Sequence, residues 1–237
     1  MAKAEVGHRV CVTGAGGFVG SWVVKELLHR GYVVRGTARD PSARKYPHLQ
    51  TLEGAAERLS LCYANVMDYN SLLVAFDGCD GVFHVASPVS NDPQFVPVAV
   101  EGTKNVINAA ADVGARRVVF TSSYGAVHMD PNRSLDTVMD ESCWSNLDFC
   151  KRKGDWYSYG KMVAEITAVE QASKRGIHLL VVVPPSRPLI KPYKFSNKRL
   201  RDLGLKFTPI KESLYNMILS LQEKGDLPTT VVPRASL

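Results

Sequence analysis

The sequence lacks the long apolar run that a membrane-spanning helix requires. A helix that crosses a bilayer needs roughly 18 to 20 consecutive apolar residues. No apolar run in the 237 residues approaches that length. The first five residues, MAKAE, contain no apolar core of the kind that a secretory signal carries. We therefore expect a cytoplasmic protein with no membrane partner.

Cysteine is present, but in no arrangement that is typical of a metal site. The five cysteines form no CxxC pair and no cluster with histidine at metal-ligand spacing, so no metal site is expected. Three of them, Cys11, Cys62 and Cys79, lie in or beside apolar stretches, where a free cysteine behaves as a small hydrophobic residue. This usage favours a reduced, cytosolic chain.

Acidic residues are scarce in one part of the chain only. Residues 1–185 contain 19 basic and 19 acidic side chains, whereas residues 186–237 contain 10 basic and 4 acidic ones. The net charge of +6 therefore arises entirely in the C-terminal part. A nucleic-acid patch, attraction of a phosphate-bearing substrate and a solvated basic surface would each explain this charge. Since no recognition motif accompanies it, we expect no nucleic-acid partner.

Apolar runs alternate with segments of helical period, which predicts a parallel sheet with helices on both faces. Six runs are expected to form buried strands: Val10–Val12, Tyr32–Val34, Leu59–Tyr63, Gly81–Val85, Val118–Thr121 and His178–Val183. Apolar residues at helical spacing mark three helices that end near glycines: Val19, Val23 and Leu27 before Gly31; Val100, Ile107 and Ala110 before Gly114; Val163, Ile166 and Val169 before Gly176. The fold class is a Rossmann-like, doubly wound α/β fold.

The alternation stops after Val183. The segment PPSRP at 184–188 cannot continue a central strand. Beyond it the sequence predicts a short basic helix near Ser196–Leu203, a turn at Gly204 and a helix near Glu212–Lys224. We expect residues 1–185 to form a dinucleotide-binding domain. Residues 186–237 would form a short basic C-terminal region that is too small for a sizeable domain of its own.

The glycine-rich segment TGAGGFVG at 13–20 directly follows the first expected strand and opens the first expected helix. Gly14, Gly17 and Gly20 allow a tight turn and let the backbone approach a pyrophosphate without a Cβ in the way. Phe18 and Val19 belong to the same turn. Because strand, glycine loop and helix occur in the right order, the segment predicts dinucleotide binding.

The residues after the second expected strand favour NADP(H). An NAD-binding protein usually carries an acidic residue there, whereas this chain has Arg39, and a guanidinium can pair with a 2′-phosphate. Lys45 adds a second positive charge, while Asp40 before Pro41 is typical of a turn. Further coenzyme contacts are expected where later strands end, at Asn65, Val66, Val85, Ala86, Ser87 and Pro185, and at Tyr157 and Lys161.

Tyr157 and Lys161 are four residues apart, so they share one face of a helix. An ammonium group near a phenol stabilises the phenolate, which suits the tyrosine for proton transfer. Ser123 follows the fifth expected strand, where its hydroxyl can reach the same pocket. The three residues together predict an active site.

These motifs resemble the extended short-chain dehydrogenase/reductase family, and more narrowly the plant cinnamoyl-CoA reductases. The resemblance rests on TGAGGFVG, ARDP, HVASP, GTKNVI, VFTSS, DWYSYGK and, near the end, KPYKFSN. It implies that NADPH reduces a hydroxycinnamoyl-CoA thioester to an aldehyde in phenylpropanoid and lignin metabolism. Ser123 would hold the carbonyl oxygen, Tyr157 would protonate it, and Lys161 would bind the nicotinamide ribose.

The sequence departs from that pattern at three places. Asp155 and Ser158 stand where the reductases carry asparagine and cysteine, and Tyr124 stands in place of an isoleucine. After Pro184 and Pro185, most of the substrate-binding segment is missing. We expect coenzyme binding to survive this loss better than turnover.

Two alternatives remain. One is a non-catalytic, truncated paralogue or splice form that binds NADP(H) or pairs with a full-length relative. The other is a carbonyl reductase similar to the dihydroflavonol reductases, whereas Arg39 argues against the NAD-dependent sugar-nucleotide epimerases. The oligomeric state is left open.

Overall fold

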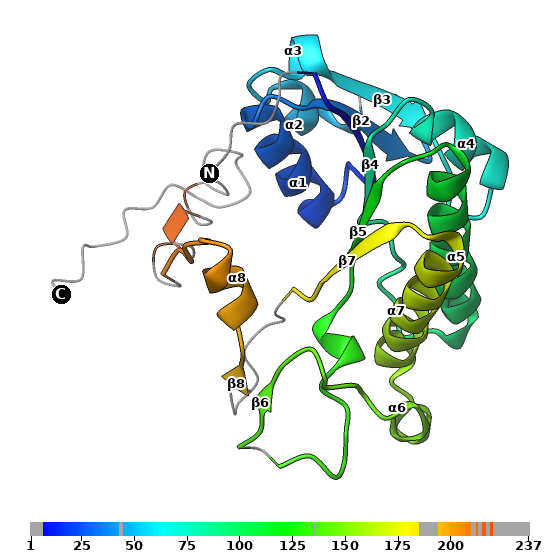
Figure 1. Ribbon diagram of the computed structural model, residues 1–237, viewed down its shortest axis with the longest axis vertical. Helices are drawn as coiled ribbons and strands as arrows, with labels where there is room; N and C mark the ends of the chain where they lie inside the picture. The colour runs from blue at the N-terminus through cyan, green and yellow to red at the C-terminus, as the bar shows by residue number, and fades with distance from the viewer. Residues whose placement is uncertain are drawn as a thin grey trace, which may run out of the picture. The chain divides into compact units, whose positions relative to one another are not determined.

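The computed structural model describes residues 7–42, 45–134, 136–184 and 194–209, together with residues 212, 215, 216 and 219 (Figure 1). The chain divides into two compact units, Met1–Phe195 and Ser196–Leu237. The domain boundary expected after residue 185 lies inside the first unit. Strand β8 (Lys194–Phe195) belongs to that unit because it pairs with β6 (Val138–Met139).

The first unit is built on a six-stranded sheet in which every pairing is parallel, with the order β3-β2-β1-β4-β5-β7. The strands are β1 (Arg9–Thr13), β2 (Val33–Ala38), β3 (Leu59–Tyr63), β4 (Gly81–His84), β5 (Arg117–Thr121) and β7 (His178–Val182). All six expected strands are therefore present, and the Rossmann-like fold class is confirmed. Strand order reverses between β1 and β4, which is where such folds bind ligands.

Helices cover the sheet on two faces (Figure 1). Helices α4 (Tyr69–Phe76), α5 (Val96–Asp112) and α7 (Trp156–Arg175) pack on one face. Helices α1 (Phe18–His29), α2 (Pro47–Gln50) and α3 (Ala55–Arg58) pack on the other. Cys11 in β1 points to the first face and its neighbours Val10 and Val12 to the second, as the two-residue period of a strand requires.

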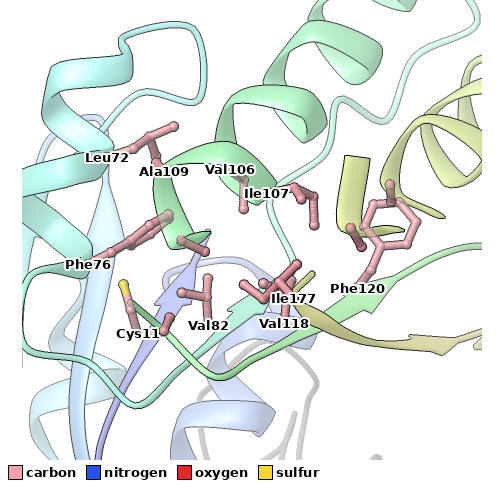
Figure 2. Packing of buried hydrophobic residues seen from close by; sticks show 14 of the residues in the cluster. Cys11, Leu72, Phe76, Val82, Val106, Ile107, Ala109, Val118, Phe120 and Ile177 are labelled. Carbon is pink, nitrogen blue, oxygen red and sulfur yellow. The ribbon is translucent and has the colours of Figure 1, made fainter. Parts of the chain in front are cut away.

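The larger core lies between the sheet and α4, α5 and α7. Figure 2 shows its fully or almost fully buried side chains, among them Phe76 from α4, Ile107 from α5 and Phe120 from β5. Cys11 and Cys79 lie in this core and Cys62 packs against it, as expected for small hydrophobic residues. This packing fixes α5 and α7 against the strands whose ends carry the site.

Glycines end three helices where the sequence predicts it. Gly31, Gly114 and Gly176 have φ angles of +86°, +76° and +65°, a region that favours glycine. The buried faces of the helices differ from the apolar stripes, however. Val19 in α1 is 41% exposed and Val169 in α7 is 46% exposed. In α7 the buried residues are mainly small or polar because the helix packs closely on α5 and lines the site.

The expectation of six buried strands is wrong for β3, in which no residue is buried, and more strongly for β7. Leu180 and Val182 are 41% and 42% exposed, and Val181 and Val183 are also exposed. β7 lies at the edge of the sheet, paired only with β5 among the described strands. Leu180 and Val182 lie on the face opposite to Leu179, which packs against the core formed with α7. Val181 shares the face of Leu179 and is exposed as well. The sequence shows an apolar run there but cannot show that its covering layer is missing.

The remaining elements are short. The first unit also contains the 3-10 helices η2 (Pro93–Phe95) and η3 (Tyr124–Ala126) and helix α6 (Leu147–Lys153). In the second unit, α8 (Lys198–Asp202) corresponds to the expected basic helix, and Gly204 follows with φ +78°. The helix expected near Glu212–Lys224 lies almost entirely outside the described residues. Within the described part of the chain, no helix is long and apolar enough to span a bilayer.

Candidate active site

The glycine loop follows β1 and leads into α1. Gly14 has a φ of +67°, and a Cβ there would lie 3.0 Å from the Ala86 Cα. A Cβ on Gly20 would lie 2.1 Å from the Gly14 carbonyl oxygen, so α1 packs directly on the loop. Phe18 and Val19, at the start of α1, are both exposed. The loop thus has the tight turn that the sequence predicts, and it packs closely against Ala86 and α1.

The N-terminus of α1 is suited to a phosphate group. Its N-cap is Gly17, which has no side chain to cap the helix, and no acidic residue lies in the first turn. The amide groups at such an end carry partial positive charge and attract anions. A dinucleotide pyrophosphate therefore fits the residues that are present.

At the carboxyl end of β2, Arg39 and Asp40 are exposed. The Asp40 carboxylate accepts hydrogen bonds from the Ser42 backbone N–H (3.2 Å) and from Lys45 Nζ (3.5 Å). The hydrogen bond from Ser42, with the Lys45 charge beside it, holds the pKa of Asp40 below its usual value. Asp40 therefore acts within the turn, while Arg39 extends beyond it.

The ends of β3 and β4 lie at the same edge of the sheet as the glycine loop. After β3, Asn65 accepts a hydrogen bond from the Met67 N–H, and Val66 packs against Gly102 of α5. After β4, the N–H groups of Val85 and Ala86 each donate to Thr13 Oγ1 at 3.1 Å. This contact joins β4 to β1 directly beneath the glycine loop. Pro185, another expected contact, lies outside the described residues.

His84, at the end of β4, had no predicted role in the site. Its Nδ1 lies 2.9 Å from Thr13 Oγ1, and its Nε2 lies 3.4 Å from Thr103 Oγ1. Thr103 donates its only hydroxyl proton to the Ala99 carbonyl, so we assign the ring proton to Nε2. Burial, with a contribution from the Lys161 charge, lowers the pKa of His84 to about 3. The neutral ring connects β1, β4 and α5.

The structure brings Ser123 and Tyr157 together. Ser123 follows β5, and Tyr157 lies in the first turn of α7. The Tyr157 Oη donates to Ser123 Oγ at 3.1 Å, and the Gly125 N–H donates to the same oxygen at 3.1 Å. The Ser123 hydroxyl therefore accepts two hydrogen bonds and keeps its own proton for a third partner. A carbonyl oxygen placed next to both hydroxyls would receive two donors.

Lys161 lies one turn further along α7 and is only 4% exposed. Its Nζ donates to the Thr121 carbonyl oxygen at 2.9 Å and to Ser87 Oγ at 3.4 Å. These bonds use two of the three ammonium protons. Burial lowers the pKa of Lys161 to about 8, and the carboxylate of Glu165 opposes that shift. Ser87, expected as a coenzyme contact, thus lies directly beside the lysine.

Glu165 is the next residue on the same face of α7 and is 8% exposed. Its Oε2 accepts a hydrogen bond from the hydroxyl of Ser122, the neighbour of Ser123. Burial raises the pKa of Glu165, whereas the Ser122 hydroxyl and the Lys161 ammonium act in the opposite direction. Glu165 was not predicted from the sequence, although its position four residues after Lys161 was a usable signal.

Two residues that depart from the cinnamoyl-CoA reductase pattern hold the start of α7. Asp155 is the N-cap, and its carboxylate accepts hydrogen bonds from the Ser158 N–H (2.9 Å) and hydroxyl (2.8 Å). Asn91 accepts a hydrogen bond from the Tyr157 N–H at 3.1 Å. A Cβ on Gly125 would lie 2.9 Å from Ser158 Oγ, so α7 packs against η3. Asp155 and Ser158 therefore support the tyrosine locally.

The space beside Tyr157 is small. A cavity of about 10 Å³ lies there, lined in part by Pro88, Phe95 and Trp156. Ligand pockets usually enclose about 300–1,000 Å³. Tyr124, the other departure, is buried and stacks on His128 with 3.8 Å between ring centroids, so it packs within this region. The groups that would transfer protons lie close together, and the cavity of about 10 Å³ beside Tyr157 is far smaller than a ligand pocket.

Comparison with known proteins shows the family to which the chain belongs. Residues 10–187 match the NAD dependent epimerase/dehydratase family. The chain belongs to that family. This match covers the sheet, the glycine loop and the Ser123, Tyr157 and Lys161 site. Together with the reductases described next, membership places the chain among the NAD(P)-dependent oxidoreductases.

Curated relatives from this family are similar over most of the chain. "Cinnamoyl-CoA reductase 1" of Oryza sativa subsp. japonica is 49% identical over 310 residues, and the alignment covers 92% of each protein. "Cinnamoyl-CoA reductase 1" of Arabidopsis thaliana is 43% identical, with 94% of this chain and 92% of the relative covered. An alignment of 310 positions exceeds the 237 residues of this chain. It therefore passes over a segment that the relative has and this chain lacks.

Solved structures of reductases have a fold similar to that of this chain. Vestitone reductase from Medicago sativa has a TM-score of 0.67 and 33% identity, over 78% of this chain and 59% of its own. Yeast methylglyoxal/isovaleraldehyde reductase Gre2, solved with NADPH, has a TM-score of 0.62 and 25% identity, over 74% of this chain and 56% of its own. The chain thus spans less than two thirds of these reductases. The likeness supports a nicotinamide dinucleotide as the coenzyme.

Proposed function

We propose that the protein is an NADP(H)-dependent reductase of the cinnamoyl-CoA reductase type, with hydroxycinnamoyl-CoA thioesters as its substrate class. The observation that carries this proposal is the contact of 3.1 Å between the hydroxyls of Tyr157 and Ser123, next to a buried Lys161. These groups lie at the carboxyl edge of the sheet, with the glycine loop of β1 at the same edge. The similarity to curated cinnamoyl-CoA reductases supports the substrate class.

Several residues fit NADP(H). The amide groups at the N-terminus of α1 would bind the pyrophosphate, with Gly14, Gly17 and Gly20 allowing its close approach. Arg39 would pair with the 2′-phosphate, because Lys45 and the Ser42 N–H already engage the neighbouring Asp40 carboxylate. The NADPH bound to Gre2 supports the phosphorylated coenzyme. When bound, it would supply the hydride for carbonyl reduction.

The protein side chains would bind and protonate the substrate oxygen. Ser123 would donate its free hydroxyl proton to the thioester carbonyl oxygen, and Tyr157 would give its proton to that oxygen as negative charge develops. Lys161 would use its remaining N–H to hold the ribose of the coenzyme. The hydroxyl of the resulting hemithioacetal would then return its proton to Tyr157 as the carbon–sulfur bond breaks, which yields the aldehyde. The CoA thiolate that leaves would take a proton from solvent.

A second candidate function is coenzyme binding without turnover. It is favoured by the cavity of only about 10 Å³ next to Tyr157 and by the segment that is absent relative to the cinnamoyl-CoA reductases. Substrate that is misplaced by about 1 Å can react ~100-fold more slowly, and an open site keeps its water. Such a chain would act only as an NADP(H)-binding protein or through a full-length relative. Its cytoplasmic location stays a prediction.

The test measures binding and turnover separately. We expect NADPH to quench the intrinsic fluorescence saturably and to bind at least about tenfold more tightly than NADH, a preference that Arg39→Gln abolishes. With feruloyl-CoA, Tyr157→Phe is expected to lower the rate of NADPH oxidation by about 100-fold or more and to leave NADPH affinity unchanged. The matched control is Tyr159→Phe, since the Tyr159 ring contacts Trp156 and Lys151 instead of Ser123. Saturable binding without turnover would support the second candidate; no binding of either coenzyme would refute both.

A further inference from the structure

Behind the proposed active site lies a second buried polar pair that the reaction does not use. It consists of Glu165 on α7 and Ser122 at the end of β5, joined by a hydrogen bond in which the serine hydroxyl donates. Both side chains are more than nine-tenths buried. A buried carboxylate is costly unless hydrogen bonds and an opposite charge stabilise it, so its presence requires an explanation.

The hydrogen bond connects the two segments that build the site. Ser122 stands between Thr121, whose carbonyl oxygen accepts from Lys161 Nζ, and Ser123, whose hydroxyl accepts from Tyr157. Its backbone N–H also donates to the Val182 carbonyl oxygen of β7. Fixing Ser122 to α7 therefore fixes the distance between the Thr121–Ser123 segment and the helix that carries the tyrosine and lysine.

The charge of the carboxylate acts on Lys161. The two residues are one helical turn apart on the same buried face of α7, where low polarity strengthens their attraction. Among the described residues, His84 of β4 and Glu165 of α7 interact electrostatically with the lysine, and Tyr157 of α7 lines the same small cavity. The end of β5 presents hydroxyls and a carbonyl, and Ser87 presents a hydroxyl. Burial keeps His84 neutral, and Glu165 is the group on this face of α7 whose carboxylate charge favours the ammonium form of Lys161.

We propose that Glu165 is a positioning residue, whose carboxylate, anchored by Ser122, keeps the Lys161 side chain charged and directed at the coenzyme side of the site. The inference rests on the proposed function, because it assigns a role within the same site. Without Glu165 the lysine would have burial acting on it alone, and burial favours the neutral amine. The positive charge would then be lost within the range of pH at which the protein works.

The experiment measures the charge of Lys161 in the full chain without coenzyme. Protein labelled with ¹³C at lysine Cε is titrated from pH 6 to 10.5, and the Lys161 resonance is assigned by its absence in Lys161→Met. The wild-type resonance is expected to titrate near pH 8. Glu165→Gln removes the charge and keeps the size of the side chain and one acceptor oxygen for Ser122, while an amide NH2 replaces the other oxygen. It is expected to shift the midpoint to lower pH by about one unit or more.

The control is Glu170→Gln on the exposed side of α7, which is expected to leave the midpoint unchanged. A midpoint that is also unchanged in Glu165→Gln would overturn the proposal. If that variant does not fold, the carboxyl ¹³C resonance of Glu165 in the wild-type protein decides. An ionised carboxylate at pH 7 supports the proposal, and a protonated one overturns it. Neither result depends on turnover, so failure of the proposed reductase activity would be seen separately.

Discussion

The two faces of the sheet are covered to different extents. On one face, α4, α5 and α7 bury side chains of β1, β4 and β5 almost completely, and Val82 and Phe120 are each 1% exposed. On the other face, α1, α2 and α3 cover β1 and β2, but Leu180 and Val182 in β7 are more than 40% exposed. A cavity of about 340 Å³ also opens near the amino ends of β1, β4 and β5, where Phe83 and Val119 form part of its lining.

This difference separates two parts of the proposed function. The residues expected to bind coenzyme and transfer a proton lie at strand ends and on α7. The face of the sheet that α4, α5 and α7 cover, here called the complete face, fixes these strand ends and α7 in position. The incomplete face belongs to β5 and β7, after which the cinnamoyl-CoA reductase pattern loses its substrate-binding segment. We therefore propose a coenzyme site that is formed and a substrate side that is open.

The largest effect on coenzyme binding is expected at the glycine loop. If it were absent, the coenzyme site would not lie at this loop. Gly20→Ala places a methyl group 2.1 Å from the Gly14 carbonyl oxygen, so the loop must shift away from the position at which its amides meet a phosphate. We expect NADPH affinity to fall by about 100-fold, since hydrogen bonds to a charged group are each worth about 1.5–3 kcal/mol. Fluorescence titration measures it.

The matched control is Gly114→Ala, at a glycine of φ +76° with open space around it. It should cost about 1 kcal/mol of stability through backbone strain and leave NADPH affinity unchanged. Equal affinity of wild type and Gly20→Ala would show that the coenzyme binds elsewhere.

Two leucines compare the faces directly. Leu72 in α4 is 0% exposed in the complete core, and Leu180 in β7 is 41% exposed. Leu72→Ala is expected to lower the free energy of unfolding by about 3 kcal/mol, because it leaves a cavity. Leu180→Ala should lower it by less than about 1 kcal/mol, since the side chain buries little surface. Urea unfolding of both variants measures the difference. Similar losses would mean that another part of the chain, or a second molecule, covers β7 in solution.

The buried His84 ring makes the stability of the protein depend on pH. The folded protein keeps His84 neutral down to a pKa of about 3, whereas the unfolded chain takes up the proton below about pH 6.5. The unfolded state therefore binds more protons in this window, and stability is lost as the pH falls from 6.5 towards 3. The contribution of His84 should reach about 2 kcal/mol at pH 5.

His84→Gln should flatten this part of the stability profile, measured by urea unfolding between pH 7 and 5. His29→Gln, at an exposed position at the end of α1, is the control and should leave the slope unchanged. An unchanged slope in His84→Gln would show that the ring is already accessible to protons.

The sequence by itself determined the strands, the helix ends and the order of the motifs. Apolar runs and terminating glycines act locally, so the bounds of β3 and the turns at Gly31, Gly114 and Gly176 could be predicted from neighbouring residues alone. Tyr157 and Lys161 could be paired because helical spacing fixes which residues share a face.

Only the tertiary structure decided which groups are buried and what they contact. The Thr13 and Thr103 partners of His84, the Ser122 partner of Glu165 and the contact of Asn91 with α7 join segments far apart in sequence. The exposure of β7 could not be predicted either, because an apolar run has the same sequence whether or not a helix covers it. Burial depends on all the layers that pack together, and a single strand or helix carries no record of its neighbours.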